Sequence, residues 1–237
     1  MRRSIVTEAV ELDSRVFVFD MDDTLYLERD FARSGFAAVG DLLAHRFDQA
    51  AFAQVCFDLL DRGERGNIFD LALREIGVDP EDRLIADLVA AYRRHTPTIR
   101  MCDDAQRFLD QLGEAPTGLI SDGPSRTQAA KVVALGLEGR IDHIILTGAW
   151  PEGYGKPHPR AFERIQQLTG FAASEIAYIA DNAAKDFVAP NRLGWQTVQI
   201  MRKDRIHTGS PPSPDHAAMH VVASFDEISI SADLRLT

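Results

Sequence analysis

Short apolar runs that end at a polar residue recur along this chain, and they constrain its fold more than any other feature. The first run, Val16–Phe19, ends at Asp20 and has the length of a strand buried on both faces. Beyond Pro97, strand patterns alternate with amphipathic helical patterns, as in βαβ units. Right-handed crossovers place such strands in one sheet with helices on both faces, so we predict an α/β fold with a doubly wound parallel sheet. The strands are expected at Val16–Phe19, Thr117–Ile120, His143–Thr147, Ile176–Ala180 and Thr197–Ile200, with Val221 and Val222 as a further edge strand.

The segment from Asp30 to Arg94 has a different pattern, which is helical throughout. Apolar residues such as Phe36, Val39 and Leu43 recur at helical spacing, and Asp79 with Pro80 makes a good helix start. We expect four helices here that form a separate lobe. The predicted domains are therefore an α/β core, residues 1–27 and 96–237, and a small all-helical domain, residues 28–95.

Polar residues of complementary type follow four of the five predicted strands. They are Asp20 and Asp22, then Ser121, then Lys156, and finally Asp181 with Asp186. Each alone has an ordinary explanation, because Asp and Ser stabilise turns. Parallel strands end at one edge of a sheet, however, and carboxylates gathered there repel each other unless a hard cation lies among them. The sequence therefore predicts a site for Mg²⁺ and an anion at this edge.

Four motifs carry a resemblance to a known family. The stretch Val-Phe-Val-Phe-Asp20-Met-Asp22-Asp-Thr24-Leu25 resembles the first motif of the haloacid dehalogenase-like superfamily, in which DxDxT follows an apolar strand. The second, third and fourth motifs are resembled, in the same order, by Leu119-Ile120-Ser121, by Lys156 in Gly-Lys-Pro-His-Pro, and by Ala-Tyr-Ile-Ala-Asp181 with Asp186. Two departures are Asp122, where many members have Asn, and Ala180, where they have Gly.

The resemblance implies a Rossmann-like core, a helical cap between the first and second motifs, and a phosphatase. The reaction would be Mg²⁺-dependent hydrolysis of the phosphate monoesters of small metabolites, through an aspartyl-phosphate intermediate. Asp20 would be the nucleophile, and Asp22 would exchange protons with the leaving group and with water, its pKa raised by neighbouring carboxylates.

The resemblance also implies which residues bind phosphate and metal. Ser121, the backbone around Asp122 and the ammonium group of Lys156 would hold the phosphoryl oxygens. The metal would be held by the side chains of Asp20 and Asp181 and the backbone carbonyl of Asp22, with Asp186 binding directly or through water. Dehalogenating members lack an acid at the position of Asp22, because a halide leaves without a proton.

Four further residues lie near the motifs but have weaker claims: Asp23, Asn182, Lys185 and His158. Asn182 is a candidate to line the site. We expect Lys185 to be a solvated helix charge, and His158, between Pro157 and Pro159, to take no part in the chemistry.

Other functions have to be weighed against this one. Signalling receiver domains also combine an acidic pair, a phosphorylated Asp, a Ser or Thr and a Lys on a parallel sheet. In receivers the acidic pair follows the first strand and the phosphorylated Asp follows a later one, whereas here a later acidic pair, Asp181 and Asp186, comes after the Lys. A relative without turnover and a phosphotransferase both stay open, because fold does not fix function. The identity of the leaving group and the oligomeric state are open as well.

Composition narrows the class of partner. The 237 residues carry a net charge of -10, which disfavours contact with nucleic acid or an anionic membrane and favours a small phosphorylated metabolite. Residues 1–15 lack the apolar core of a signal peptide, and no run approaches the length of a membrane span, so a cytoplasmic location is expected. Cys56 and Cys102 have no metal or redox spacing and are expected to be reduced thiols.

Overall fold

The computed structural model describes residues 9–43 and 49–231, and the chain divides into two compact units. The first comprises Met1–Glu28 and Arg100–Thr237, and the second comprises Arg29–Ile99. Each unit has its own secondary structure and its own core, and each is described by itself.

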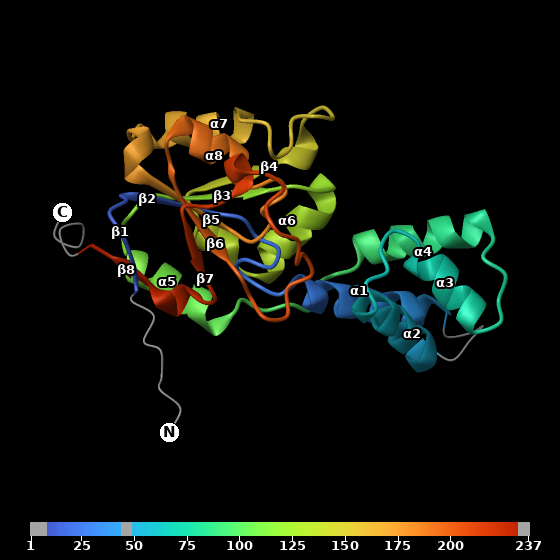
Figure 1. Cartoon of the computed structure of the whole chain (residues 1–237). Helices are drawn as coiled ribbons and strands as arrows, with labels where there is room; N and C mark the ends of the chain where they lie inside the picture. Colours follow the sequence, from blue (N-terminus) through green and yellow to red (C-terminus); the bar gives the residue numbers. More distant parts are fainter. Residues whose placement is uncertain (1–8, 44–48, 232–237) are drawn as a thin grey trace, which may run out of the picture. The chain divides into compact units, whose positions relative to one another are not determined.

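A six-stranded sheet forms the centre of the first unit (Figure 1). Its strands run parallel in the order β4-β3-β2-β5-β6-β7, so the chain builds outward from β2 first on one side and then on the other. All the predicted strands are confirmed, including the edge strand, although Thr147 begins a 3₁₀ turn instead of ending β4. The strands are β2 (Val16–Phe19), β3 (Thr117–Ser121), β4 (His143–Leu146), β5 (Ile176–Ala180), β6 (Gln196–Ile200) and β7 (His220–Val222).

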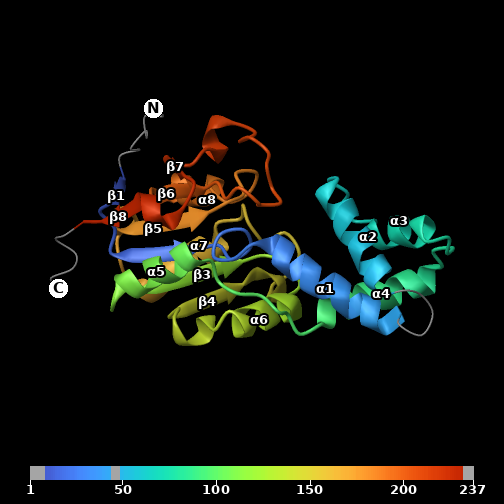
Figure 2. The same cartoon turned by 90° about the horizontal axis from the view of Figure 1, so that it is seen from below.

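Helices cover both faces of this sheet. Helices α5 (Asp103–Leu112) and α6 (Ser125–Ala134) lie on one face, and α7 (Arg160–Thr169) and α8 (Val188–Leu193) lie on the other (Figures 1 and 2). The predicted doubly wound α/β fold is confirmed. In such a fold the crevice for ligands lies at the carboxyl ends of the strands where the direction of winding reverses, which here means beside β2.

Strand β2 is apolar at every position because both of its faces are buried. Phe17 and Phe19 pack edge-on against Phe108 of α5, with ring centroids 5.8 Å and 6.2 Å apart. Val16 and Val18 face the opposite side and belong to the same buried cluster as Ile165 of α7 and its neighbours. Because both faces of β2 are packed against helices, the position of Asp20, which directly follows the strand, is well defined.

A second, two-stranded sheet was not predicted from the sequence. Strand β1 (Val10–Leu12) pairs in parallel with β8 (Ile228–Ile230), which joins the two ends of the described chain. Strands of three residues carry too little periodicity to be recognised, and their pairing depends on segments far apart in sequence. The remaining short elements are the 3₁₀ turns η1 (Leu137–Gly139), η2 (Thr147–Ala149), η3 (Ala173–Glu175), η4 (Pro214–His216) and η5 (Phe225–Glu227).

The second unit is helical in its described residues, as the sequence predicts. Its helices are α1 (Glu28–Leu43), α2 (Gln49–Asp61), α3 (Ile68–Glu75) and α4 (Asp82–Arg94). An aromatic cluster joins α1, α3 and α4, with Phe36 packed on both Phe69 and Tyr92. Gly35 of α1 lets the Tyr92 ring approach closely, because a Cβ atom there would lie 2.4 Å from the ring.

None of the described helices combines the length and apolar character that crossing a membrane requires. Cys56 and Cys102 are not joined in a disulfide, and burial raises the pKa of Cys56 to about 12.

A buried ion pair ties distant parts of the first unit to the loop that follows β2. The guanidinium group of Arg202 donates to both oxygens of Asp104 at 3.1 Å and to the carbonyl of Thr24 at 2.8 Å and 2.9 Å. Asp104 also accepts hydrogen bonds from Ser224 Oγ and the Phe225 amide, both at 2.9 Å. Burial opposes the charge, but these hydrogen bonds and Arg202 hold the pKa of Asp104 below its ordinary value.

We predict that Asp104→Asn lowers the free energy of unfolding by about 3 kcal/mol at pH 7, because it leaves a buried guanidinium without its counter-charge. A depressed pKa means that the ionised carboxylate stabilises the fold above the unfolded pKa of about 3.9 and that this stabilisation is lost as the pH falls below it. Urea unfolding at pH 7 measures the difference. The matched control is Asp103→Asn, whose side chain is 70% exposed and which should change stability by less than about 0.5 kcal/mol. Equal effects of the two substitutions would contradict the prediction.

Candidate active site

The structure brings four of the predicted site residues together at the carboxyl ends of the strands. Asp20 follows β2, Asp181 and Asp186 follow β5, and Lys156 lies in the loop after η2. The pairing of β2 with β5 aligns Phe19 with Ile179, so the segments that carry Asp20 and Asp181 leave the sheet side by side.

Three carboxylates form the centre of this site. Asp20, Asp181 and Asp186 each offer an oxygen, and these three oxygens lie within 4.8 Å of one another. The residues are only 4%, 2% and 0% exposed, respectively. Within the described part of the chain, Oδ2 of Asp181 is buried without a hydrogen-bond partner. A buried, all-oxygen donor set with an unsatisfied carboxylate oxygen fits a hard divalent cation such as Mg²⁺.

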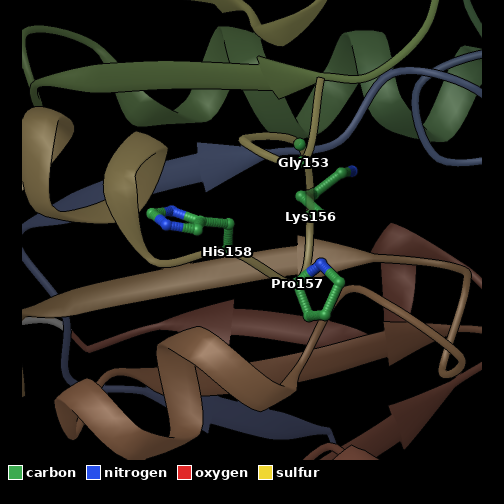
Figure 3. Close-up of a pocket in the computed structure, with 5 residues that line it drawn as sticks. Gly153, Lys156, Pro157 and His158 are labelled. Carbon is green, nitrogen blue, oxygen red and sulfur yellow. The ribbon is translucent and has the colours of Figure 1, made fainter. Parts of the chain in front are cut away.

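Lys156 supplies a positive charge to these carboxylates. Its Nζ lies 2.5 Å from Oδ1 of Asp20 and 2.8 Å from Oδ1 of Asp186, and it donates to the hydroxyl of Tyr178 at 3.1 Å. Lys156 also lines a pocket of about 470 Å³ that opens beside the loop. Its side chain extends toward the end of the sheet to which the strands point, whereas the ring of His158 points the opposite way (Figure 3).

The pKa values show that the positive charge is insufficient for this many carboxylates. Burial, followed by the charges of Asp20 and Asp186, raises the pKa of Asp181 to about 10. Burial raises the pKa of Asp20 to about 6, although Lys156 opposes the shift. One ammonium group therefore does not neutralise the cluster, and a proton or a cation must complete it.

Asp22 has different surroundings from those we expected. Its Oδ1 accepts from Lys131 Nζ at 2.7 Å and from the hydroxyl of Tyr26, and its Oδ2 accepts from Gln128 Nε2 at 3.0 Å. Burial favours the neutral form, but the charge of Lys131 and these hydrogen bonds lower the pKa of Asp22 below its ordinary value. The expectation that neighbouring carboxylates raise this pKa is therefore wrong, because Lys131 and the hydrogen bonds to the carboxylate outweigh the effect of burial.

Ser121 and Asp122 lie at the end of β3, and their side chains differ in availability. The hydroxyl of Ser121 is buried and has no hydrogen-bond partner in the described structure, so it is free to bind a ligand. The carboxylate of Asp122 already accepts from Thr147 Oγ1 at 2.6 Å, from the Lys156 amide at 3.2 Å and from Lys185 Nζ at 3.3 Å. Its side chain thus fixes the loop that carries Lys156.

Lys185 is not the solvated helix charge that the sequence suggested. It lies in a turn before α8, and its side chain is 33% exposed and pairs with Asp122. This contact links the segments that follow β3 and β5. It also offsets the negative charge of Asp122.

The other three residues with weaker claims make local contacts. The carboxylate of Asp23 accepts from the amides of Glu28 and Ile206, and Asp23 itself adopts a left-handed backbone with φ of 53°. Asn182 accepts from the Ala184 amide, and His158 accepts from the Arg160 amide. These contacts shape turns around the site.

Sequence reasoning missed five residues that contact the site: Tyr26, Gln128, Lys131, Thr147 and Tyr178. Gln128 and Lys131 lie three residues apart on α6, so they share a face of that helix. Their spacing was available from the sequence, but polar residues on a helix usually face water, and nothing in the sequence marks this face as buried.

We predict that Gly148→Ala destabilises the protein by about 1–3 kcal/mol, because it overpacks the site. An added Cβ atom would lie 1.9 Å from the carbonyl oxygen of Gly123 and 2.9 Å from the Ser125 amide, so the turn after Asp122 would have to move. Thermal unfolding measures the effect. Gly139→Ala is the control, since nothing lies within 4 Å of a Cβ atom there. The prediction is wrong if the two variants unfold at the same temperature.

Comparison with known proteins points to one family. The sequence model of the haloacid dehalogenase-like hydrolase family matches residues 15–194. A glyceraldehyde 3-phosphate phosphatase from Methanopyrus kandleri is 28% identical over 198 residues, which cover 79% of this chain and 84% of that enzyme. An (S)-2-haloacid dehalogenase from Xanthobacter autotrophicus is 25% identical over 130 residues, which cover 55% of this chain and 49% of the dehalogenase.

Solved structures give the same result for the fold. The HAD hydrolase YfnB from Bacillus subtilis, crystallised with magnesium, superposes with a TM-score of 0.65 at 16% sequence identity. The superposition covers 90% of this chain and 96% of YfnB. At this level of identity the similarity concerns the fold alone.

Proposed function

Because the chain belongs to the haloacid dehalogenase-like hydrolase family, we propose that it is a magnesium-dependent phosphatase of small phosphate monoesters. The observation that carries the proposal is the cluster of Asp20, Asp181 and Asp186 around Lys156, with the free hydroxyl of Ser121 at the end of the neighbouring strand. The similarity to a phosphatase over most of both chains supports it.

The residues that would hold Mg²⁺ are the side chains of Asp20, Asp181 and Asp186, together with the backbone carbonyl of Asp22. When bound, the ion supplies positive charge that offsets the carboxylates and the phosphate dianion. Asp181 is the strongest candidate ligand, because its Oδ2 is buried and has no hydrogen-bond partner among the described residues.

In the first step, a carboxylate oxygen of Asp20 attacks phosphorus, and the bond between phosphorus and the leaving oxygen breaks. The leaving oxygen takes a proton from Asp22. Lys131 stabilises the ionised form of this side chain, whereas the negative charge of a bound phosphoryl group favours the protonated form that this step needs. Ser121 and Lys156 contact the phosphoryl oxygens, and backbone amides near Asp122 add donors. The products of this step are an alcohol and an acyl phosphate on Asp20.

In the second step, water attacks phosphorus and gives a proton to Asp22, and the bond between phosphorus and Asp20 breaks. The net reaction converts a phosphate monoester and water into an alcohol and inorganic phosphate. Asp20 and Asp22 return to their starting states.

The carboxylate at Asp22 favours a phosphatase over a dehalogenase. An alkoxide is a strong base that needs a proton to leave, whereas a halide does not. The dehalogenase that resembles this chain matches over only about half of its own length, so it carries less weight than the phosphatase.

We further propose that residues 28–95 act as a cap for the core. Closing a lid excludes water and adds contacts to the part of the substrate beyond the phosphoryl group. The helical character and separate packing of Arg29–Ile99 support this role.

We predict that the purified protein hydrolyses 4-nitrophenyl phosphate with Mg²⁺. Asp20→Asn should lower the rate at least about 10³-fold, because an amide cannot serve as the nucleophile. A chelator should lower the rate as strongly, because it removes the cation that offsets the carboxylates and the phosphate. Colorimetric release of nitrophenolate measures the rate. Wild-type protein that releases no phosphate from this substrate or from a panel of phosphorylated metabolites would contradict the proposal and favour a non-catalytic or phosphotransferase relative.

We predict that Mg²⁺ at 100 times its dissociation constant stabilises the protein by about 2.7 kcal/mol, which raises the melting temperature by about 5–10 °C. Asp181→Asn should remove this gain but cost little stability without metal, since burial and the neighbouring carboxylates disfavour the charged form of Asp181. Differential scanning fluorimetry with and without Mg²⁺ measures both effects. The exposed Asp79→Asn serves as control and should keep the full gain; a gain that also survives in Asp181→Asn would place the metal elsewhere.

A further inference from the structure

Helix α6 supplies two side chains that hold Asp22, although no motif includes them. Lys131 Nζ lies 2.7 Å from Oδ1 of Asp22, and Gln128 Nε2 lies 3.0 Å from Oδ2. Gln128 and Lys131 are only 4% and 3% exposed. Each oxygen of the Asp22 carboxylate thus has its own donor from the same face of one helix.

Gln128 also connects Asp22 to the end of β3. Its amide nitrogen donates to the backbone carbonyl of Asp122 as well as to Asp22. The adjacent Gly123 has φ of 115°, and a Cβ atom there would lie 2.9 Å from this nitrogen. The turn therefore needs glycine both for its backbone conformation and to leave room for the Gln128 amide.

The buried lysines around the site have different carboxylates as their partners. Lys131 pairs with Asp22, whereas Lys156 pairs with Asp20 and Asp186. Asp22 thus has a counter-charge, Lys131, that is separate from the ion pairs of Lys156 with Asp20 and Asp186. A lysine with so little exposure would be costly to bury unless it had such a partner.

We infer that Gln128 and Lys131 are positioning residues for Asp22: they fix its carboxyl group in one orientation beside Asp20. The inference rests on the proposed function, in which Asp22 gives a proton to the leaving oxygen and later takes one from water. An Asp side chain has two rotatable bonds, so donors at both oxygens restrict the rotation that would otherwise move the carboxyl group away from the reacting oxygens.

A positioning role predicts a selective defect. Loss of general acid catalysis slows the departure of a basic leaving group much more than that of an acidic one, because only the basic one needs a proton. Aryl phosphates of similar size provide the series of probes, from 4-nitrophenyl phosphate, with an acidic leaving group, to phenyl and 4-methoxyphenyl phosphate, with basic ones. A merely structural role would lower all the rates by the same factor.

The experiment compares kcat/KM on this series for wild type, Lys131→Met, Gln128→Leu and the control Arg126→Met, which removes an exposed cation from the same helix. We expect Lys131→Met and Gln128→Leu to lose about 10²-fold on phenyl and 4-methoxyphenyl phosphate and less than about 5-fold on 4-nitrophenyl phosphate. Arg126→Met should match wild type throughout. Thermal unfolding checks that each variant is folded, and Gln128→Leu, which disturbs no charge, carries the test if Lys131→Met does not fold.

Each result has one meaning. A steeper dependence on leaving-group basicity in the folded variants supports the inference. Equal losses on all the aryl phosphates, or no loss, overturn it while leaving the proposed function intact. A wild-type protein that hydrolyses no member of the series overturns the proposed function itself, and the inference with it.

Discussion

Electrostatic repulsion among three buried carboxylates is the constraint on which the rest of this site depends. Asp20, Asp181 and Asp186 converge because β2 and β5 are neighbours in a parallel sheet and end at the same edge. Burial makes the ionised forms costly, and Lys156 supplies a single positive charge between two of them. Such an arrangement persists in a folded protein because the apolar strands beneath it are rigid and covered on both faces. This imbalance of charge supports the proposal that the site binds a divalent cation and an anionic substrate.

The surrounding side chains distribute the remaining charges so that each segment is held in place. Lys185 offsets Asp122, and Asp122 in turn fixes the loop that carries Lys156. In the loop that follows β2, the carbonyl of Thr24 accepts hydrogen bonds from Arg202. The loops at the strand ends are thus connected by polar contacts to each other as well as to the sheet.

Local patterns explain which features of the fold could be predicted from the sequence. An apolar run such as Val16–Phe19 identifies a buried strand by itself, and the residue after it is then placed at the edge of the sheet. The contacts of Lys131 and Lys185 could not be predicted in this way, because they depend on which face of a helix or turn the tertiary fold buries. The pKa of Asp22 was mistaken for the same reason: the carboxylates near it are visible in the sequence, whereas Lys131 lies 109 residues away along the chain. The small sheet of β1 and β8 likewise depends on a pairing between distant ends.

The central claim is that Asp20 carries the phosphoryl group during turnover. The most direct measurement is to quench the protein during hydrolysis of a phosphate monoester, reduce it with borohydride, and locate the product by peptide mass spectrometry. An acyl phosphate is reduced to an alcohol, whereas a free carboxylate is not, so the account predicts homoserine at position 20. Continued release of phosphate with no change at Asp20, or with the change at another residue, would contradict it.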